Sequence, residues 1–81
     1  MFDKKIHLLA IAVQDRKKNA AKVNAVLSEY GDDILSRTGM PHTEHDVSLI
    51  SVFIKAKENR MTKLKQKLQQ IPDIRIESLT V

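Results

Sequence analysis

The sequence predicts an α+β fold of the ferredoxin-like βαββαβ type, a four-stranded antiparallel sheet with two helices on one of its faces. Two runs, Ile6–Val13 and Val47–Ala56, carry apolar residues on both faces, which is typical of central strands. Two further segments have the three-and-four apolar spacing of helices that pack on a sheet. The polar segment Pro41–Asp46 predicts a turn between the second and third strands.

The first half of the chain predicts a strand, a helix and a second strand. Ile6–Val13 is a continuous apolar run. The helix is expected from Asp15, as its N-cap, to about Tyr30, with Gly31 as a left-handed C-cap. Its apolar positions are Ala20, Val23, Val26, Leu27 and Tyr30. The second strand, Ile34–Met40, contains several polar residues and therefore suits an edge of the sheet.

The second half predicts a strand, a helix and a last strand. Val47–Ala56 is rich in β-branched and aliphatic residues and contains no glycine or proline. The helix after Lys57 is expected to have Asn59 as its cap and Pro72 just past its end. Its buried stripe comprises Met61, Leu64, Leu68 and Ile71. Ile74–Val81 closes the chain as a strand.

The face of the sheet that no helix covers is expected to contact another subunit. Strand alternation puts Val47, Leu49, Ser51, Phe53 and Lys55 on one face of the third strand. With both helices on the other face, this largely apolar face would remain exposed. Ala10, Ala12 and Ser51, if they lie there, would let a second sheet approach closely. We therefore predict a homo-oligomer, a dimer or a tetramer, with Leu49, Ser51 and Phe53 at the interface.

Length and composition predict one globular domain, residues 1–81. A chain of 81 residues buries only about 60% of its unfolded surface, so assembly would help to stabilise it. The absence of cysteine excludes disulfides, zinc–thiolate sites and thiol catalysis. No apolar run reaches the length of a membrane span, so we expect a cytoplasmic protein without a membrane partner. The net charge of +4 permits weak attraction to anionic partners.

Direct nucleic-acid binding is not favoured by the sequence. RNA-recognition domains share this order of elements but need aromatic residues on the central strands, and Phe53 is the only one there. The region around the second helix is basic, with Lys55, Lys57, Arg60, Lys63, Lys65 and Lys67 against one acid, Glu58. A solvated helix face explains these cations better than a phosphate-binding stripe does. A nucleic-acid-binding module that uses this basic helix remains an alternative.

Metal and catalytic signals are weak. His42 and His45, with carboxylates nearby, could hold a divalent cation, although a solvated turn explains them better. His7, in an apolar strand, is expected to be a hydrogen-bonded structural residue. No catalytic grouping or Gly-rich phosphate loop is recognisable, so we expect the protein not to be an enzyme, and the sequence names no cofactor.

The chain resembles the iron-only hydrogenase system regulators, a family related in fold to ACT domains and to the C-terminal domain of nickel-responsive repressors. The stretches that carry the resemblance are VNAVLSEYGDDILSRTGMP (residues 23–41), VSLISVFIKA (47–56) and KLQQIPDIRI (67–76). The resemblance implies an ACT-like regulatory domain that oligomerises through its sheets and strand edges and senses a metal or small molecule between subunits. The chain has no ribbon-helix-helix arm and no complete nickel-ligand set, so neither operator binding nor nickel is implied.

The resemblance also suggests where an effector would bind. In ACT-like assemblies the loop after the first strand, here Gln14, Asp15 and Arg16, lies near the second strand of a neighbour, which here carries Arg37 and Gly39. Arg37 could hold an anionic molecule above the space left by Gly39. Alternatively, Arg37 forms a surface ion pair with Asp32, Asp33 or Glu77, and Gly39 permits a bulge. We therefore expect a transcriptional or metabolic regulator that senses a ligand, with a ligand-free protein-interaction subunit as another alternative.

Overall fold

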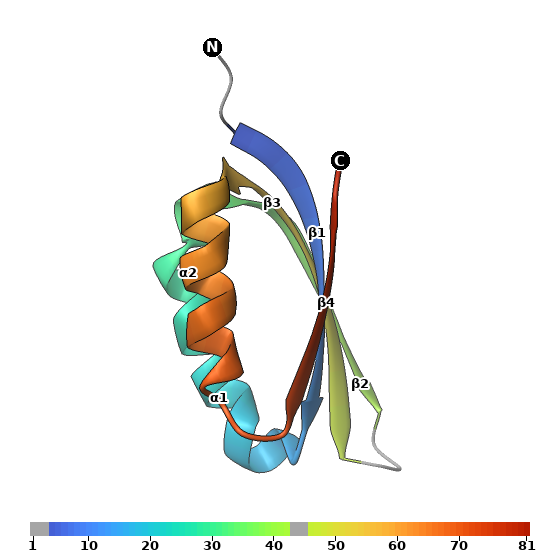
Figure 1. The fold of residues 1–81 in the computed structure, drawn as a ribbon. Helices are drawn as coiled ribbons and strands as arrows, with labels where there is room; N and C mark the ends of the chain where they lie inside the picture. Colours follow the sequence, from blue (N-terminus) through green and yellow to red (C-terminus); the bar gives the residue numbers. More distant parts are fainter. Residues whose placement is uncertain (1–3, 43–45) are drawn as a thin grey trace.

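The computed structural model describes residues 4–42 and 46–81. Its elements are β1 (Lys4–Gln14), α1 (Arg16–Glu29), the 3₁₀ turn η1 (Gly31–Asp33), β2 (Ile34–His42), β3 (Val47–Lys57), α2 (Glu58–Gln69) and β4 (Ile74–Thr80). The strands form one sheet in the order β2-β3-β1-β4, and all neighbours are antiparallel. The α+β ferredoxin-like fold is confirmed, with the first and third strands central and the second at an edge (Figure 1).

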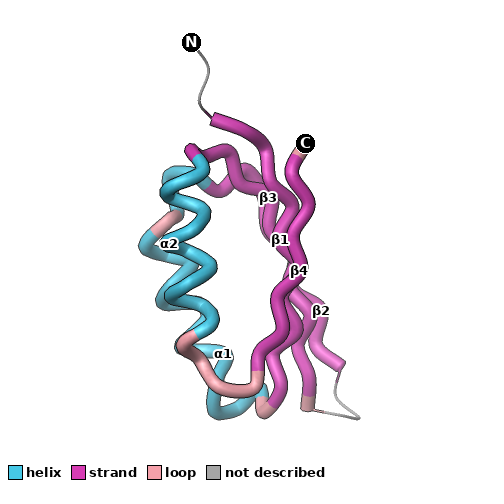
Figure 2. The backbone as a smooth tube through the Cα atoms, viewed as in Figure 1, coloured by secondary structure: helices cyan, strands magenta, loops and turns pink. Residues whose placement is uncertain are grey.

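The molecule has two layers, with both helices on the same face of the sheet (Figures 1 and 2). Side chains alternate along the central strands, so Leu9, Ile11 and Val13 of β1 are buried against the helices. The strand β3 contributes Ile50, Val52, Ile54 and Ala56 to the same core. From α2, Met61, Leu64 and Leu68 are buried, and Ile71, the fourth predicted apolar residue, is buried just past the end of the helix at Gln69. The other face of the sheet has no covering layer among the described residues.

The helix α1 buries a polar residue that the sequence pattern did not indicate. Asn19 is fully buried together with Val23 and Leu27, whereas Ala20 and Val26 are only partly buried. The amide nitrogen of Asn19 donates hydrogen bonds of 3.0 Å to the carbonyl oxygens of Gln14 and Pro72. This side chain therefore ties the end of β1 to the loop between α2 and β4.

Two predicted helix caps are wrong. Gly31 has no positive φ; the last position of α1 is capped by Tyr30 at φ −110°, and the chain continues directly into η1. Since Asp33 donates its backbone N–H to the carbonyl of Tyr30 at 3.0 Å, no left-handed glycine is needed. The helix α2 begins at Glu58 directly after β3, so Asn59 lies inside it and the N-cap position falls on Lys57.

The end of the sheet next to α1 is closed by backbone hydrogen bonds between loops. Asp15 occupies the predicted N-cap position, but its φ is 50° and its side chain makes no cap hydrogen bond. Asp46 and Asp73 also have positive φ values, of 50° and 62°. Their carbonyl oxygens accept hydrogen bonds from the N–H groups of Arg16 and Gln14, at 3.1 and 2.9 Å. Three separate loops therefore meet at this end.

The edge strand β2 is longer than expected, and its β-bulge is not at the position that the sequence suggested. It extends through Pro41 and His42, which the sequence assigned to the turn. The register with β3 shifts between Ile34 and Ser36, so the extra residue is Leu35, and Gly39 lies in regular pairing with Ile50. The bulge suggested at Gly39 is therefore wrong. None of the described helices is long and apolar enough to cross a membrane.

Candidate functional site

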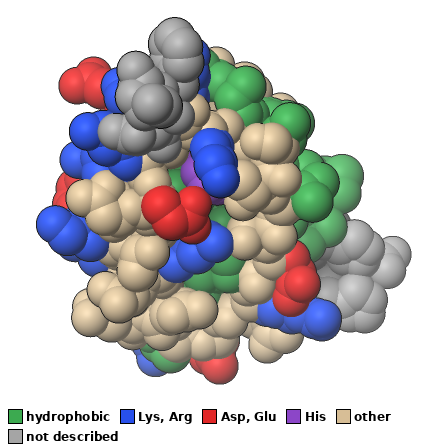
Figure 3. All heavy atoms as spheres, turned by 45° about the horizontal axis from the view of Figure 1, so that its top comes forward, with side chains coloured by type: hydrophobic (Ala, Val, Ile, Leu, Met, Phe, Trp, Pro, Cys, Tyr) green, Lys and Arg blue, Asp and Glu red, His purple; other side chains and the backbone are tan. Residues whose placement is uncertain are grey.

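The open face of the sheet, the one opposite the helices, presents large apolar side chains to solvent. Leu49 and Phe53 on β3 are 40% and 41% exposed. Ile6, Met40 and Leu79 are also exposed and lie on the same face by strand alternation. Figure 3 shows hydrophobic side chains gathered toward the sheet and Lys and Arg side chains mostly toward the helices. The three residues predicted for an interface, Leu49, Ser51 and Phe53, all belong to this face.

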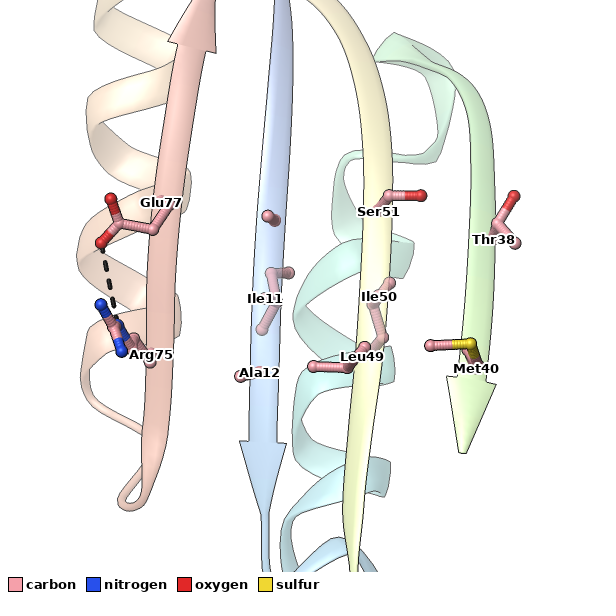
Figure 4. Close-up of a pocket in the computed structure, with 10 residues that line it drawn as sticks. Ile11, Ala12, Thr38, Met40, Leu49, Ile50, Ser51, Arg75 and Glu77 are labelled. Carbon is pink, nitrogen blue, oxygen red and sulfur yellow. Dashed lines mark ion pairs between the residues drawn. The ribbon is translucent and has the colours of Figure 1, made fainter. Parts of the chain in front are cut away.

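A shallow depression of about 520 Å³ lies in the middle of the open face. Two rows of cross-strand neighbours line it (Figure 4). The first row comprises Arg75, Ala12, Leu49 and Met40, and the second comprises Glu77, Ala10, Ser51 and Thr38. Between the rows lie Ile11 and Ile50, whose side chains are buried on the helix side. As predicted, the small residues Ala10, Ala12 and Ser51 lie on the open face.

Among the described residues that line the depression, the charged ones lie at its β4 edge. Arg75 and Glu77 extend from β4 on the open face, with 3.9 Å between Nε and Oε2 (Figure 4). Their side chains are 82% and 74% exposed. This separation is too long for a hydrogen bond, so the pair is loose, and its contribution to stability is about 1 kcal/mol or less.

The residues predicted to bind an effector are not brought together within one chain. Gln14 pairs with Val47 of β3, and Arg37 pairs with Val52 on the same strand. Five residue steps of β3 therefore separate the two levels, which is roughly 17 Å along the strand. A Cβ added at Gly39 would meet no atom of another segment within 4 Å, so there is open space beside β2. A ligand that touches both groups of residues would have to lie between two copies.

Arg37 does not form the ion pair considered from the sequence. Its Nη2 donates a 2.6 Å hydrogen bond to Oδ1 of Asn24 on α1. Two of the three expected acidic partners are engaged elsewhere, since Asp33 pairs with Arg60 at 2.6 Å and Glu77 lies beside Arg75. Arg37 and Gly39 are both on the helix side of β2, not on the open face.

The predicted metal site lies largely outside the described residues. His45 falls in the segment 43–45, and only the backbone of His42 is described, as the last residue of β2. Within residues 4–42 and 46–81, no three His, Cys, Asp or Glu side chains are grouped to hold a metal ion. His7 is fully buried with its Nδ1 3.2 Å from Oγ1 of Thr80, as expected for a structural histidine.

The basic residues near α2 do not form one continuous stripe. Lys55 lies on the open face of β3, away from the helix. Arg60 pairs with Asp33, and Lys67 pairs with Glu29 at 2.6 Å. Both cations also lie over the ring of Tyr30, at 4.8 and 5.7 Å from its centroid. Arg60 and Lys67 are thus engaged within the chain, so the basic residues that the nucleic-acid alternative would use do not form one surface.

A four-stranded sheet of this order, with both helices on one face, has the architecture of an ACT-like domain. The ACT domain from the GTP pyrophosphokinase of Chlorobium tepidum is similar, with a TM-score of 0.78 and 17% identity over 94% of this chain and 99% of that chain. The C-terminal domain of the MgtC protein from Mycobacterium tuberculosis has a TM-score of 0.75 and 9% identity, over 98% and 89% of the two chains. At these identities the similarity concerns the fold alone.

The chain belongs to the TM1266-like family, described as "Iron-only hydrogenase system regulator, putative", whose family model matches residues 5–78. The structure of the uncharacterized protein TM1266 from Thermotoga maritima is 32% identical, with a TM-score of 0.92 over 96% of this chain and 98% of that chain. A comparison with curated proteins found no match. The resemblance inferred from the sequence is therefore confirmed, and membership of this family supports a regulatory role.

Proposed function

We propose that the protein is a non-enzymatic regulatory domain that works as a homo-oligomer and senses a small-molecule or metal effector between its subunits. The observation that carries the proposal is the open face of the sheet. At least 40% of each of four large apolar residues is exposed there: Leu49, Phe53, Met40 and Leu79. The opposite face of the sheet is buried under the helices and forms the core. An apolar surface of this kind on a small domain is typical of a contact with another protein chain.

The effector would bind outside the open-face contact. Arg37 and Gly39 lie on the helix side of the edge strand β2, so a contact through the open face leaves them accessible. A second contact, along β2, could bring these residues of one copy to Gln14, Asp15 and Arg16 of another. Two kinds of contact would give a tetramer, whereas the open face alone would give a dimer.

The mass of the protein in solution tests the assembly. We expect light scattering at micromolar concentration to give a dimer or a tetramer for the parent. Leu49→Glu and Phe53→Glu should each dissociate the open-face contact, because a charge buried without a partner costs roughly several kcal/mol. Gln66→Glu is the control, since it adds the same charge at an exposed position of α2, outside both the open face and β2, and should keep the parent's mass. A monomeric parent, or a parent-like mass for both β3 variants, would contradict the proposal.

A further inference from the structure

The two rows that line the depression differ in size and in charge. The first row, Arg75, Ala12, Leu49 and Met40, holds a cation and two large apolar side chains. The second row, Glu77, Ala10, Ser51 and Thr38, holds an anion and small side chains at the same strand positions. On β2, β3 and β4, each member of one row therefore has, two residues along its own strand, a member of the other row with complementary properties, whereas β1 has alanine in both rows. Figure 4 shows the labelled members of the rows at two levels across the strands.

We infer that a second copy of this chain packs on the open face about a two-fold axis that runs across the strands between the two rows. The inference rests on the proposed function and specifies its open-face contact. An axis at the level of Gly39, Ile50, Ile11 and Ile76, which are neighbours across the sheet, exchanges one row with the other. Each strand then lies over the same strand of the second copy and runs in the opposite direction.

This arrangement makes the centre of the apolar face complementary to itself. Leu49 lies over Ser51 of the second copy, and Met40 lies over Thr38 of the second copy, so a large side chain meets a small one in both places. The two-fold axis repeats each of these contacts once more. Ala12 lies over Ala10 of the second copy, which lets the sheets approach closely at the central strand β1. Phe53 is three residues from Ile50 on β3, so it meets Val47 of the second copy, three residues on the other side. The contact therefore uses the depression, where large side chains find space.

The same axis makes the charged edge complementary. Arg75 of each copy lies over Glu77 of the other, so two ion pairs form at the β4 edge. Packed sheets are rotated by about 30° from each other, which opens a gap toward the edges, and these long side chains can span it. Their contact within one chain, at 3.9 Å, is loose enough to be exchanged for one between chains. An axis along the strands would instead place β4 over β2, where the depression has no charged side chain.

Charge exchange tests this register. Arg75→Glu gives a chain with two acids at the edge, and Glu77→Arg gives a chain with two bases, so each variant alone should repel its copy. We expect the dissociation constant to rise about tenfold or more for each. Mixing the two variants should produce a heterodimer, because each acid then meets a base, and the double variant R75E/E77R should regain the parent's dimer. Both side chains are largely exposed within one chain, so all variants are expected to fold.

Analytical ultracentrifugation and native mass spectrometry of the parent, the variants and the mixture distinguish the outcomes. Recovery in both the mixture and the double variant supports the two-fold register. If Leu49→Glu dissociates the parent's dimer but the charge variants leave it unchanged, the register is wrong and the proposed function stands. Dissociation of the single variants without recovery in the mixture also overturns the register. A monomeric parent overturns the register and the proposed function together.

Discussion

The guanidinium of Arg37 donates a 2.6 Å hydrogen bond to the side-chain oxygen of Asn24, which joins the edge strand β2 to helix α1. This contact satisfies only part of a side chain that has five N–H donors in a planar fork. Gly39, two residues further along β2 on the same side, leaves space beside it. Arg37 can therefore hold a place in the fold and still bind an anionic group.

The proposed effector site predicts a ligand-dependent gain in stability that depends on Arg37. In a thermal-shift screen of amino acids, nucleotides and divalent metals, we expect a ligand to raise the melting temperature of the parent by mass action. Arg37→Ala should lose most of that shift, because it removes the cation. Asn24→Ala is the control, since it removes only the hydrogen-bond partner and should keep the shift. An equal response from Arg37→Ala, or no active compound in the screen, would eliminate this site.

The buried amide of Asn19 predicts a large effect of a small substitution. Asn19→Ala leaves the carbonyls of Gln14 and Pro72 without their donor, at a cost of roughly 2–4 kcal/mol in the free energy of unfolding. Asn19→Asp should cost more, because a carboxylate would face two carbonyl oxygens. Urea unfolding at fixed protein concentration measures both values.

Asn59→Asp is the control for this pair of variants. It makes the same chemical change at an exposed position in the first turn of α2, where an acid is tolerated. We expect its free energy of unfolding to stay within about 0.5 kcal/mol of the parent's. Equal effects of Asn19→Asp and Asn59→Asp would mean that the two hydrogen bonds of Asn19 contribute nothing.

The two faces of β3 could be predicted from the sequence because alternation along a strand has a period of two residues. Ile50, Val52 and Ile54 are buried as expected, and Leu49 and Phe53 are on the open face. The rows of the depression could not be predicted, since they depend on the register of three strand pairs. That register is a property of the whole sheet and is not visible in any one strand.

Predictions from short stretches of sequence were wrong where a following or neighbouring element changed the backbone conformation or the burial of a residue. Gly31 follows α1 and suited a left-handed C-cap, but the chain enters η1 there and needs no positive φ. Asn19 was missed because a single polar residue in a helix predicts exposure. Its spacing of four from Val23 and eight from Leu27 is the signal that could have placed it on the buried stripe.

The ring of Tyr30 predicts an energetic coupling between the two helices. The guanidinium of Arg60 lies 4.8 Å from the centroid of this largely buried ring. In a double-mutant cycle of Arg60→Ala and Tyr30→Leu, we expect a coupling energy of about 0.5–1 kcal/mol. The same cycle with Lys63→Ala in place of Arg60→Ala serves as the control and should give a coupling near zero. Equal couplings in the two cycles would show that the ring does not interact specifically with Arg60.

The ion pair between Lys67 and Glu29 predicts a stabilising contribution that is lost when Lys67 is deprotonated at high pH. The 2.6 Å hydrogen bond to Glu29, and then its negative charge, raise the pKa of Lys67 above its usual value of 10.5. A raised pKa in the folded state means that the folded protein holds the proton more tightly than the unfolded chain does. With Glu29 ionised, the contribution is therefore complete below pH 10.5 and is lost as the pH rises through the higher pKa of the folded state.

An NMR titration that follows the Cε resonance of Lys67 checks this directly. Glu29→Gln keeps a hydrogen-bond acceptor but removes the charge, so we expect the pKa of Lys67 to fall toward its usual value. Added salt should reduce the difference between the parent and the variant, because both side chains are about half exposed. Glu58→Gln, which removes an acid at the other end of α2, is the control and should leave the titration of Lys67 unchanged. If Lys67 titrates at the same pH in the parent and in Glu29→Gln, the pair does not exist in solution.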